Sequence, residues 1–298
     1  MPTVQTTARQ QTAFDLGRIK QESFVRQVLF HPVLPSTNDF ALDLAAQQEL
    51  ATPVLVLTET QTAGRGRGSN RWWSQEGALT FSLVLDGPSE KGDRSNLPER
   101  PEGCSAPIGP VPFFARVSLT AALAVCQVLE QLVPHIPCGI RWPNDVHCAG
   151  RKICGVLPEL AQPPREPRNR IVEPPIPARL VLGVGVNINN SLAAAPPDVR
   201  TVGTSMFDVT AKYYALTDCL LQVLERLSGG LDALAADDPR MAEAWSRRCL
   251  LRERMVELRV GPRLVQGVCQ GIDRDGALVL QTPRGNERFM GGVVTAVK

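Results

Sequence analysis

Three short apolar runs constrain the fold of this 298-residue chain most strongly. They are "PVLVLTET" (53–60), "ALTFSLVL" (78–85) and "RLVLGVGVNIN" (179–189). Each run is rich in β-branched and aliphatic residues and is bounded by turn-forming residues, which is typical of a strand. The first two lack the alternation of a half-exposed strand, so we expect both of their faces to be buried. The sequence therefore predicts a sheet with a buried centre.

Further strands and four helices are predicted around these runs. The additional strands cover 140–148 and 152–160. Good helix formers, or apolar residues at helical spacing, predict helices over 36–50, 113–133, 217–227 and 238–248. Ser36 and Thr37 are candidate N-caps of the first helix. No uninterrupted apolar run approaches the roughly 20 residues that span a bilayer.

Changes in composition divide the chain into segments. Residues 1–30 are expected to form a partly helical or loose N-terminal segment, and residues 31–250 the main domain. Proline, glycine and charged residues predict surface insertions at 86–112 and 161–178. From residue 251 to 298, short β-rich runs alternate with Gly-Pro, Asp-Gly and Arg-Gly turns. This tail predicts a small antiparallel barrel of about five strands.

Charge and cysteine content exclude several classes of protein. The net charge is only +2, so a nucleic-acid partner would need a local basic patch. The N-terminus lacks the apolar stretch of a secretory signal, and we expect a cytoplasmic protein. The eight cysteines include no Cys-x-x-Cys pair, and His147, Cys148 and Cys154 match no zinc spacing. Buried, reduced thiols are therefore expected, with no structural metal site.

The segment "TETQTAGRGRGSNRWW" (58–73) connects the first two predicted strands and places three arginines among three glycines. Glycines let a ligand approach the backbone, and arginines bind phosphate or carboxylate through two parallel hydrogen bonds. Similar compositions also occur in nucleic-acid-binding tails and in plain surface turns. Taken alone, the loop leaves a phosphate cradle, a nucleic-acid tether and a surface turn open.

The stretch "RWPNDVHCAGRKICGVLPEL" (141–160) predicts a hairpin that carries polar groups. Pro143 interrupts the strand and places Asn144 and Asp145 at a turn. A second turn then brings Lys152 back towards them. Each residue has an ordinary explanation, as a turn aspartate or a solvated lysine, but their combination favours a functional site.

Glycines inside predicted strands form the third feature. "LGVGVNINN" (182–190) contains two of them, and Gly155 lies in the preceding strand. Glycine weakens a strand, so its presence indicates that a flat ligand or another backbone lies against the strand. Asn187 would then supply a polar group at the strand end. Close packing between sheets explains the same glycines equally well.

Five ordered motifs together resemble one known family. They are "STN" (36–38), "QTAGRGRGSNRW" (61–72), "RWPND" (141–145), "GRKICGVLPE" (150–159) and "GVGVNIN" (183–189). Their order and spacing resemble the successive motifs of biotin protein ligases, and the tail resembles the small C-terminal β-barrel of that family. The resemblance runs from about residue 33 to 298 and is interrupted by the two proline-rich stretches. It implies an α+β fold, with a mixed or antiparallel sheet and flanking helices as in class II synthetases, followed by a five-stranded barrel.

The resemblance also implies a two-step reaction. Biotin and ATP form biotinyl-5′-AMP with loss of pyrophosphate, and a lysine of a biotin carboxyl carrier protein domain then attacks the adenylate and releases AMP. The cofactors implied are ATP and Mg²⁺, with biotin as substrate. A carboxylate and a phosphate repel each other, so cations must offset that repulsion during their union. The resemblance gives this catalytic role to Lys152 and Arg67.

The remaining site residues follow from the same motifs. The biotin- or adenylate-binding positions implied are Ser36, Thr37, Asn38, Gln61, Gly64, Arg65, Gly66, Arg67, Trp72, Lys152 and Gly155. The positions implied near the nucleotide and its metal are Asn144, Asp145 and Asn187. The chain departs from the family pattern at Gly68-Ser69-Asn70-Arg71, so no function is given to Asn70, and Arg71 is expected only as a supporting charge.

Three alternatives remain beside this interpretation. A lipoate ligase or octanoyl transferase has the same fold. A nucleic-acid-binding regulator would use the arginine loop on phosphates, although the near-neutral chain and the lack of room for a three-helix module argue against it. A non-catalytic scaffold would not depend on Lys152. We expect a ligase that does not bind operator DNA or a membrane, and copies of the chain can associate through an exposed sheet.

Overall fold

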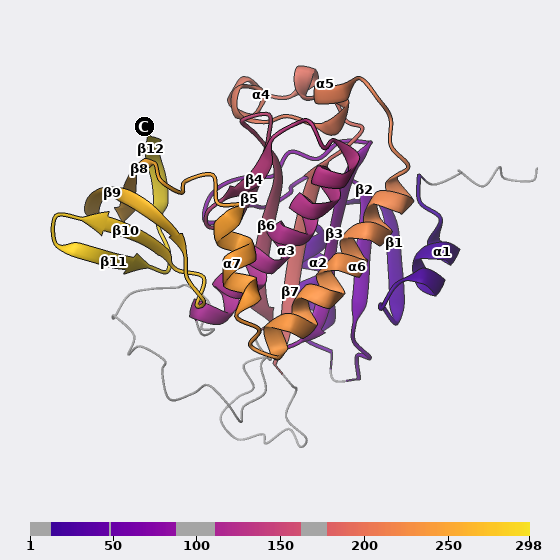
Figure 1. Cartoon of the computed structure of the whole chain (residues 1–298). Coiled ribbons are helices and arrows are strands. Elements are labelled where there is room, and N and C mark those ends of the chain that lie inside the picture. Colours follow the sequence, from indigo (N-terminus) through magenta and orange to yellow (C-terminus); the bar gives the residue numbers. More distant parts are fainter. Residues whose placement is uncertain (1–12, 48, 88–110, 162–177) are drawn as a thin grey trace, which may run out of the picture.

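A mixed seven-stranded sheet forms the centre of the molecule, and a separate five-stranded sheet lies beside it (Figure 1). The structure is a computed structural model and describes residues 13–47, 49–87, 111–161 and 178–298. In spatial order the large sheet consists of β1 (Gln27–Leu34), β2 (Val54–Gln61), β3 (Ala78–Asp86), β7 (Arg179–Asn187), β6 (Arg151–Ala161), β5 (Asp145–Cys148) and β4 (Cys138–Arg141). β1 and β2 are parallel and the other neighbours are antiparallel. The predicted mixed sheet is therefore confirmed.

Helices cover both faces of the central strands, which explains their continuous apolar sequence. Along β2, Leu55 and Leu57 face the core beneath α3 (Val111–Leu132) and α6 (Leu216–Ala235). The alternate residues Val54 and Val56 face α2 (Thr37–Ala45) on the other side. A strand covered in this way needs no polar face, because neither side meets water. The predicted burial of β2 and β3 is confirmed.

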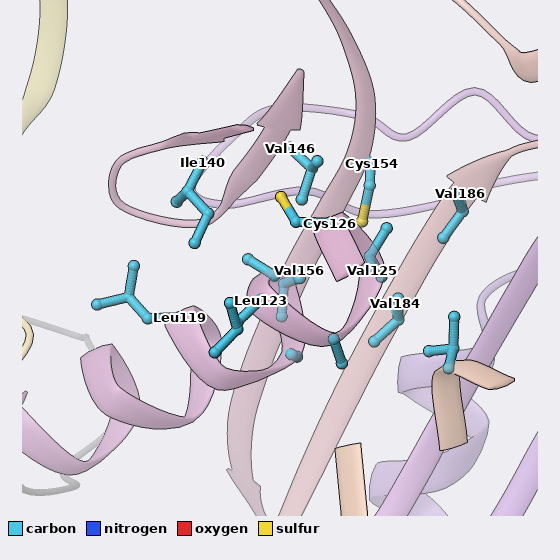
Figure 2. Close-up of a cluster of buried hydrophobic side chains, with 14 of the residues drawn as sticks. Leu119, Leu123, Val125, Cys126, Ile140, Val146, Cys154, Val156, Val184 and Val186 are labelled. Carbon is cyan, nitrogen blue, oxygen red and sulfur yellow. The ribbon is translucent and has the colours of Figure 1, made fainter. Parts of the chain in front are cut away.

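The core on the α3 side is made of aliphatic side chains and thiols. Figure 2 shows α3 residues packed against residues of β4 to β7, with Cys126 and Cys154 among them. By length and composition, Pro112–Leu132 would suffice to cross a bilayer, but 67% of its apolar window is buried inside the protein. The core helix of a protein that is not in a membrane passes the same test, and α3 packs as such a helix against the sheet.

Several elements match or extend the sequence prediction. The predicted helices appear as α2, α3, α6 and α7 (Arg240–Arg247), and the Ser36 hydroxyl accepts the N–H of Asp39 at 3.3 Å as the N-cap of α2. The N-terminal segment contains α1 (Leu16–Glu22) and runs into β1, which the sequence pattern did not reveal. β1 is an edge strand, so its burial is only partial and its apolar pattern is weak. The short helices η2 (Leu192–Ala194), α4 (Pro197–Val202) and α5 (Met206–Thr210) were also not anticipated.

The predicted strand 140–148 is split into β4 and β5, and Pro143 lies in the connection as expected. The two predicted insertions, 86–112 and 161–178, fall almost entirely outside the described residues. The seven described cysteines are free thiols, six of them buried, as the sequence predicts; Cys104 lies outside the described part of the chain.

The C-terminal sheet has the five antiparallel strands that the turns predict. They are β8 (Met255–Val260), β9 (Arg263–Ile272), β10 (Leu278–Thr282), β11 (Gly285–Phe289) and β12 (Val293–Val297), in the order β11-β10-β9-β8-β12. β11 and β12 are its edges, so the strand pairings do not close a complete barrel. Contacts at the turn between β9 and β10 and at the end of β9 join this sheet to the main domain. The indole N–H of Trp142 donates to the carbonyl oxygen of Gly276 at 3.0 Å, and the N–H of Ile272 donates to the Ser246 hydroxyl at 3.4 Å.

Replacing Trp142 with phenylalanine is expected to lower the free energy of unfolding by about 1–3 kcal/mol, because the buried carbonyl of Gly276 loses its donor. Urea unfolding measures the change. Trp245→Phe is a matched control, since Trp245 is equally buried but its Nε1 has no hydrogen-bond partner among the described residues. Equal losses in the two variants would contradict a contribution from the hydrogen bond.

Candidate active site

A cleft of about 220 Å³ opens where α2, the loop after β2, strands β4 to β7 and β12 converge. Twelve of the residues predicted from sequence line it: Ser36, Thr37, Asn38, Gln61, Arg65, Gly66, Arg67, Trp72, Asn144, Asp145, Lys152 and Gly155. These residues come from motifs up to 119 positions apart, as the contact between Asn38 and Leu157 shows. The fold therefore brings the sequence motifs into one site.

The N-terminus of α2 forms one wall, and its polar side chains are buried and paired. The Oε1 atom of Gln61 accepts the backbone N–H of Thr37 at 2.7 Å and the Thr37 hydroxyl at 3.1 Å. Asn38 accepts the Ser82 hydroxyl at 2.6 Å and donates to the carbonyl of Leu157 at 3.1 Å. These contacts fix the helix N-terminus against β2, β3 and β6. The N–H groups of a helix N-terminus favour a negative charge nearby.

The loop 62–77 folds as a small hairpin over the cleft. The N–H of Gly66 donates to the carbonyl of Asn70 at 2.8 Å, and the N–H of Trp72 donates to that of Gly64 at 2.9 Å. At the tip, Gly68 has a φ of 66°, a conformation that glycine adopts without strain. The stretch that departs from the family pattern therefore has a structural task, because it makes the turn of this hairpin. Both Asn70 and Arg71 also line the cleft.

The two central arginines of the loop have different partners. Arg65 binds both oxygens of Glu159, at 3.0 and 2.6 Å, and these hydrogen bonds raise its pKa. Arg67 donates to the carbonyl oxygen of Gly292 at 2.6 Å and forms no ion pair within the described ranges. Burial lowers the pKa of Arg67, an effect that the charge of Asp145 partly opposes. The charge of Arg67 is thus compensated far less than that of Arg65.

The predicted hairpin at 145–155 brings Lys152 to Asp145. The turn uses Ala149 and Gly150, with φ values of 50° and 78°, and the ammonium Nζ of Lys152 lies 2.7 Å from a carboxylate oxygen of Asp145. The same Nζ lies 5.9 Å from the ring centroid of Trp72. The carbonyl of Lys152 also accepts the N–H of Thr204 at 2.8 Å, which ties the hairpin to the segment that carries α4 and α5.

The strand glycines make room for side chains of the protein itself. A Cβ atom on Gly185 would overlap the indole of Trp72, and one on Gly183 would overlap the amide of Asn38. At Gly155 a Cβ atom would lie 3.4 Å from Cζ3 of the same indole, so this strand packs against the far edge of the ring. The Nε1 atom of Trp72 is buried and has no hydrogen-bond partner among the residues described. Trp72 itself lines the cleft.

Two predicted site residues do not line the cleft. The side chain of Asn187 is buried, donates to the carbonyl of Thr204 at 3.1 Å and accepts from Asn190 at 3.0 Å. Gly64 belongs to the loop 62–77 but does not line the cleft. A Cβ atom at this position would collide with the backbone of Trp72. Asn144 does line the cleft, and its amide donates to the carbonyl of Val156 at 2.7 Å.

The buried contacts of Asn187 predict a structural role. Asn187→Ala is expected to lower the free energy of unfolding by about 1–3 kcal/mol, because two buried polar groups lose their partner. The affinity of the cleft for a ligand should change by less than about twofold, since the side chain does not reach the cleft. Denaturant unfolding and ligand titration measure the two effects. Weaker ligand binding with unchanged unfolding would instead place Asn187 at the ligand.

Positive charge dominates the cleft. The cationic residues that line it are Arg65, Arg67, Arg71, Arg141 and Lys152, whereas Asp145 is the only carboxylate among the described residues that line it. The whole chain has a net charge of +2, so this excess is local. Apart from Arg65 and Lys152, these cations form no ion pair in the described part of the chain. The cleft is therefore suited to a ligand with several negative charges.

The sequence prediction missed Arg141, Val293 and Val294, which also line the cleft. Arg141 is paired with Asp145 in the register of β4 and β5, so its place at the end of a predicted hairpin was an available signal. Val293 and Val294 belong to β12 and reach the cleft only through tertiary packing. Among the described residues, no group of three or more His, Cys, Asp or Glu side chains is arranged to hold a metal.

Comparison with known proteins identifies relatives of the whole arrangement. The profile of the "Biotin/lipoate A/B protein ligase family" matches residues 30–99 and 105–164, and that of the "Biotin protein ligase C terminal domain" matches residues 253–295. Together the matched regions cover more than half of the chain.

Similar curated proteins include the biotin–[acetyl-CoA-carboxylase] ligase of Paracoccus denitrificans, which is 29% identical over 86% of this chain and 98% of its own length. The ligase of the same name from Mycobacterium tuberculosis is 29% identical over 82% of this chain and 79% of its own. A solved structure of the biotin protein ligase of Aquifex aeolicus with biotin and ATP aligns with a TM-score of 0.69 and 23% identity, over 92% of this chain and 99% of that one. At that identity, the structural match shows the fold.

Proposed function

The chain belongs to the biotin/lipoate A/B protein ligase family, and from this premise we propose that it is an ATP-dependent biotin–protein ligase. In the first step the biotin carboxylate attacks the α-phosphorus of ATP, and pyrophosphate leaves. In the second step a lysine amine of a carrier domain attacks the acyl carbon of biotinyl-5′-AMP, and AMP leaves. The observation that carries the proposal is the local excess of cations around the cleft, at the meeting point of all the motifs.

Lys152 and Arg67 are the cations suited to the first step. A carboxylate and a triphosphate are both anionic, and their union needs positive charge that is already in place. Lys152 is a compact charge on a rigid hairpin, and Arg67 is a planar donor on the loop above it. No covalent enzyme intermediate is required, because positioning and electrostatic stabilisation suffice for transfer of the adenylyl group to the carboxylate.

The loop 62–77 has a second task in this proposal. An acyl-adenylate is prone to hydrolysis, so the site must exclude water until the acceptor lysine arrives. The hairpin that carries Arg67 covers the cleft, and Arg67 reaches Gly292 of the C-terminal sheet. The loop and β12 thus close the cleft from two sides, as a lid would. Trp72, whose Nε1 has no hydrogen-bond partner in the described part of the chain, lines the cleft beneath them.

Mg²⁺ fits the site only as a companion of ATP. Mg²⁺ usually binds through one or two carboxylates together with substrate phosphates, and Asp145 is the one carboxylate of the described ranges that lines the cleft. Asn144 adds an amide beside it. The ion, when bound, would neutralise phosphate charge. We propose that ATP brings Mg²⁺ to these two residues, and that activity therefore depends on added Mg²⁺ rather than on a metal that co-purifies.

The acceptor proposed is the biotin carboxyl carrier domain of a biotin-dependent carboxylase. Relatives from Paracoccus denitrificans and Mycobacterium tuberculosis are named biotin–[acetyl-CoA-carboxylase] ligases. Another relative, from Bacillus subtilis, is named a bifunctional ligase/repressor and is 28% identical over 91% of this chain. For this chain we propose a cytoplasmic ligase that does not bind operator DNA, because its net charge is close to neutral. Pairing of two copies through a sheet edge stays a prediction, for which sedimentation at several concentrations is the measurement.

Incubation with biotin, ATP, Mg²⁺ and a carrier domain tests the proposal directly. The carrier domain should gain the mass of one biotinyl group, at its acceptor lysine, and ATP–pyrophosphate exchange should depend on biotin. Exchange driven by lipoate or octanoate instead would favour a ligase for those acids, and the family description also covers lipoate. Binding to nucleic acid that falls steeply with salt, without any exchange, would favour a regulator.

A further inference from the structure

Glu159 ends the motif "GRKICGVLPE" and joins two walls of the cleft. Its Oε1 accepts a hydrogen bond from Arg65 at 3.0 Å. Its Oε2 accepts one from Arg65 at 2.6 Å and one from the side-chain amide of Asn38 at 2.7 Å. The side chain is only 19% exposed. One carboxylate therefore connects the hairpin loop above the cleft to the N-terminus of α2.

Two protein carboxylates compensate the charge of Arg65, although its buried Nε has no hydrogen-bond partner among the described residues. Both of its terminal nitrogens bind Glu159, and its Nε forms an ion pair with Asp39 at 2.7 Å. Two negative charges thus surround one positive charge, so Arg65 offers an anionic ligand little attraction. Arg67 has no such partner among the described residues. The two loop arginines therefore have different roles. Arg65 anchors the loop and does not bind the phosphate or carboxylate of a ligand.

The environments of the two carboxylates decide which of them matters. Asp39 is 52% exposed, so solvent screens its pair with Arg65, and such pairs contribute little. Glu159 is largely buried and forms a bidentate pair, the geometry in which charge-assisted hydrogen bonds fix orientation as well as distance. Asn38 continues the network, since it also accepts the Ser82 hydroxyl. A change at Glu159 disturbs both walls, whereas a change at Asp39 disturbs neither.

We propose that Glu159 is a positioning residue that holds the loop over the cleft, acting through Arg65. A loop rich in glycine loses much conformational freedom when it is ordered. The protein's own carboxylate offsets part of that entropic cost, so biotin has less of it to offset on binding. The effect on biotin binding rests on the proposed function, whereas the effect on the loop rests on the contacts alone.

The kinetic test compares Glu159→Ala, Glu159→Gln, Arg65→Ala and the double variant, with Asp39→Asn as the matched control. We expect Glu159→Ala to raise the KM for biotin about tenfold in the exchange assay while kcat changes less than about threefold, because bound ligand can order the loop once it is present. Asp39→Asn should stay within about twofold of the wild type in both parameters. The double variant should be no worse than either single variant, because both changes remove the same interaction.

The second test is trypsin cleavage at the loop arginines, without substrate turnover. Glu159→Ala should be cut between residues 65 and 71 about tenfold faster than the wild type, and saturating biotin should reduce the difference. Faster cleavage throughout the chain would show general destabilisation, and Glu159→Gln, which keeps the side-chain volume, would then replace the alanine variant. A wild-type KM and wild-type loop cleavage in the Glu159 variants would overturn the inference. An absence of biotin-dependent exchange in the wild type would overturn the proposed function alone.

Discussion

Lys152→Ala is expected to lower the rate of biotin-dependent ATP–pyrophosphate exchange by about 1,000-fold. The ammonium group lies 2.7 Å from Asp145 on a hairpin that the fold holds rigidly, at the floor of a cleft lined by cations. Loss of one positioned donor to charge developing in a transition state typically costs about 100- to 1,000-fold in rate. Removal of Lys152 also leaves the Asp145 carboxylate unpaired beside the incoming anions, which adds repulsion to the lost attraction.

The fold should survive this substitution, because the Lys152 side chain is 31% exposed and its pair with Asp145 is only partly buried. Circular dichroism and the midpoint temperature of thermal unfolding measure whether the fold is retained. Lys212→Ala removes an exposed lysine from another segment and controls for the loss of one positive charge. Exchange within threefold of the wild type in Lys152→Ala would refute the catalytic assignment of Lys152, whereas an absence of exchange in the wild type itself would favour a non-catalytic protein.

Arg67→Ala is expected to lower kcat/KM for exchange by about 100-fold, the second-largest effect of a single substitution. Arg67 lines the cleft, and its charge is not compensated by an ion pair in the part of the chain described. Arg67 is exposed, and desolvation by its neighbours lowers its pKa. A hydrogen bond to a charged group contributes about 1.5–3 kcal/mol, which corresponds to roughly 10- to 100-fold in rate.

Arg67→Lys should recover only a small part of the lost activity, because lysine lacks the planar pair of donors. Arg284→Ala, in the exposed turn between β10 and β11, is the control for charge and should stay within about twofold of the wild type. Initial rates at several biotin concentrations separate KM from kcat. Full activity in Arg67→Lys would show that only the charge matters, and full activity in Arg67→Ala would remove Arg67 from the site.

Local signals explain why much of the site could be predicted from the sequence. Turn-forming residues and the spacing from Asp145 to Lys152 define a hairpin, and a hairpin fixes which side chains meet. Consecutive apolar residues likewise identify β2 and β3 as buried strands, because this signal also lies in residues that are adjacent along the chain. The order of the motifs then indicated one shared site.

What the sequence did not reveal depends on tertiary packing. Arg65 and Arg67 occupy similar positions in the pattern, yet one meets Glu159, 94 residues away, and the other meets Gly292, 225 residues away. Gly183 and Gly185 predicted that some group lies close to the strand, but they did not indicate which group. The structure places Asn38 and Trp72 against them. Asn187 lies at a strand end, as expected, but tertiary contacts bury its side chain and give it a structural role.

The contact between Arg67 and Gly292 has a consequence for the order of synthesis. A ribosome makes Arg67 well before Gly292, so the two atoms cannot meet until 225 further residues have been added. The sheet and the loop can fold earlier, because β2, β3 and the hairpin between them are close in sequence. A growing chain therefore contains the loop arginines before it contains β12, which lines one side of the cleft. The cleft therefore becomes complete only after β12 has been made.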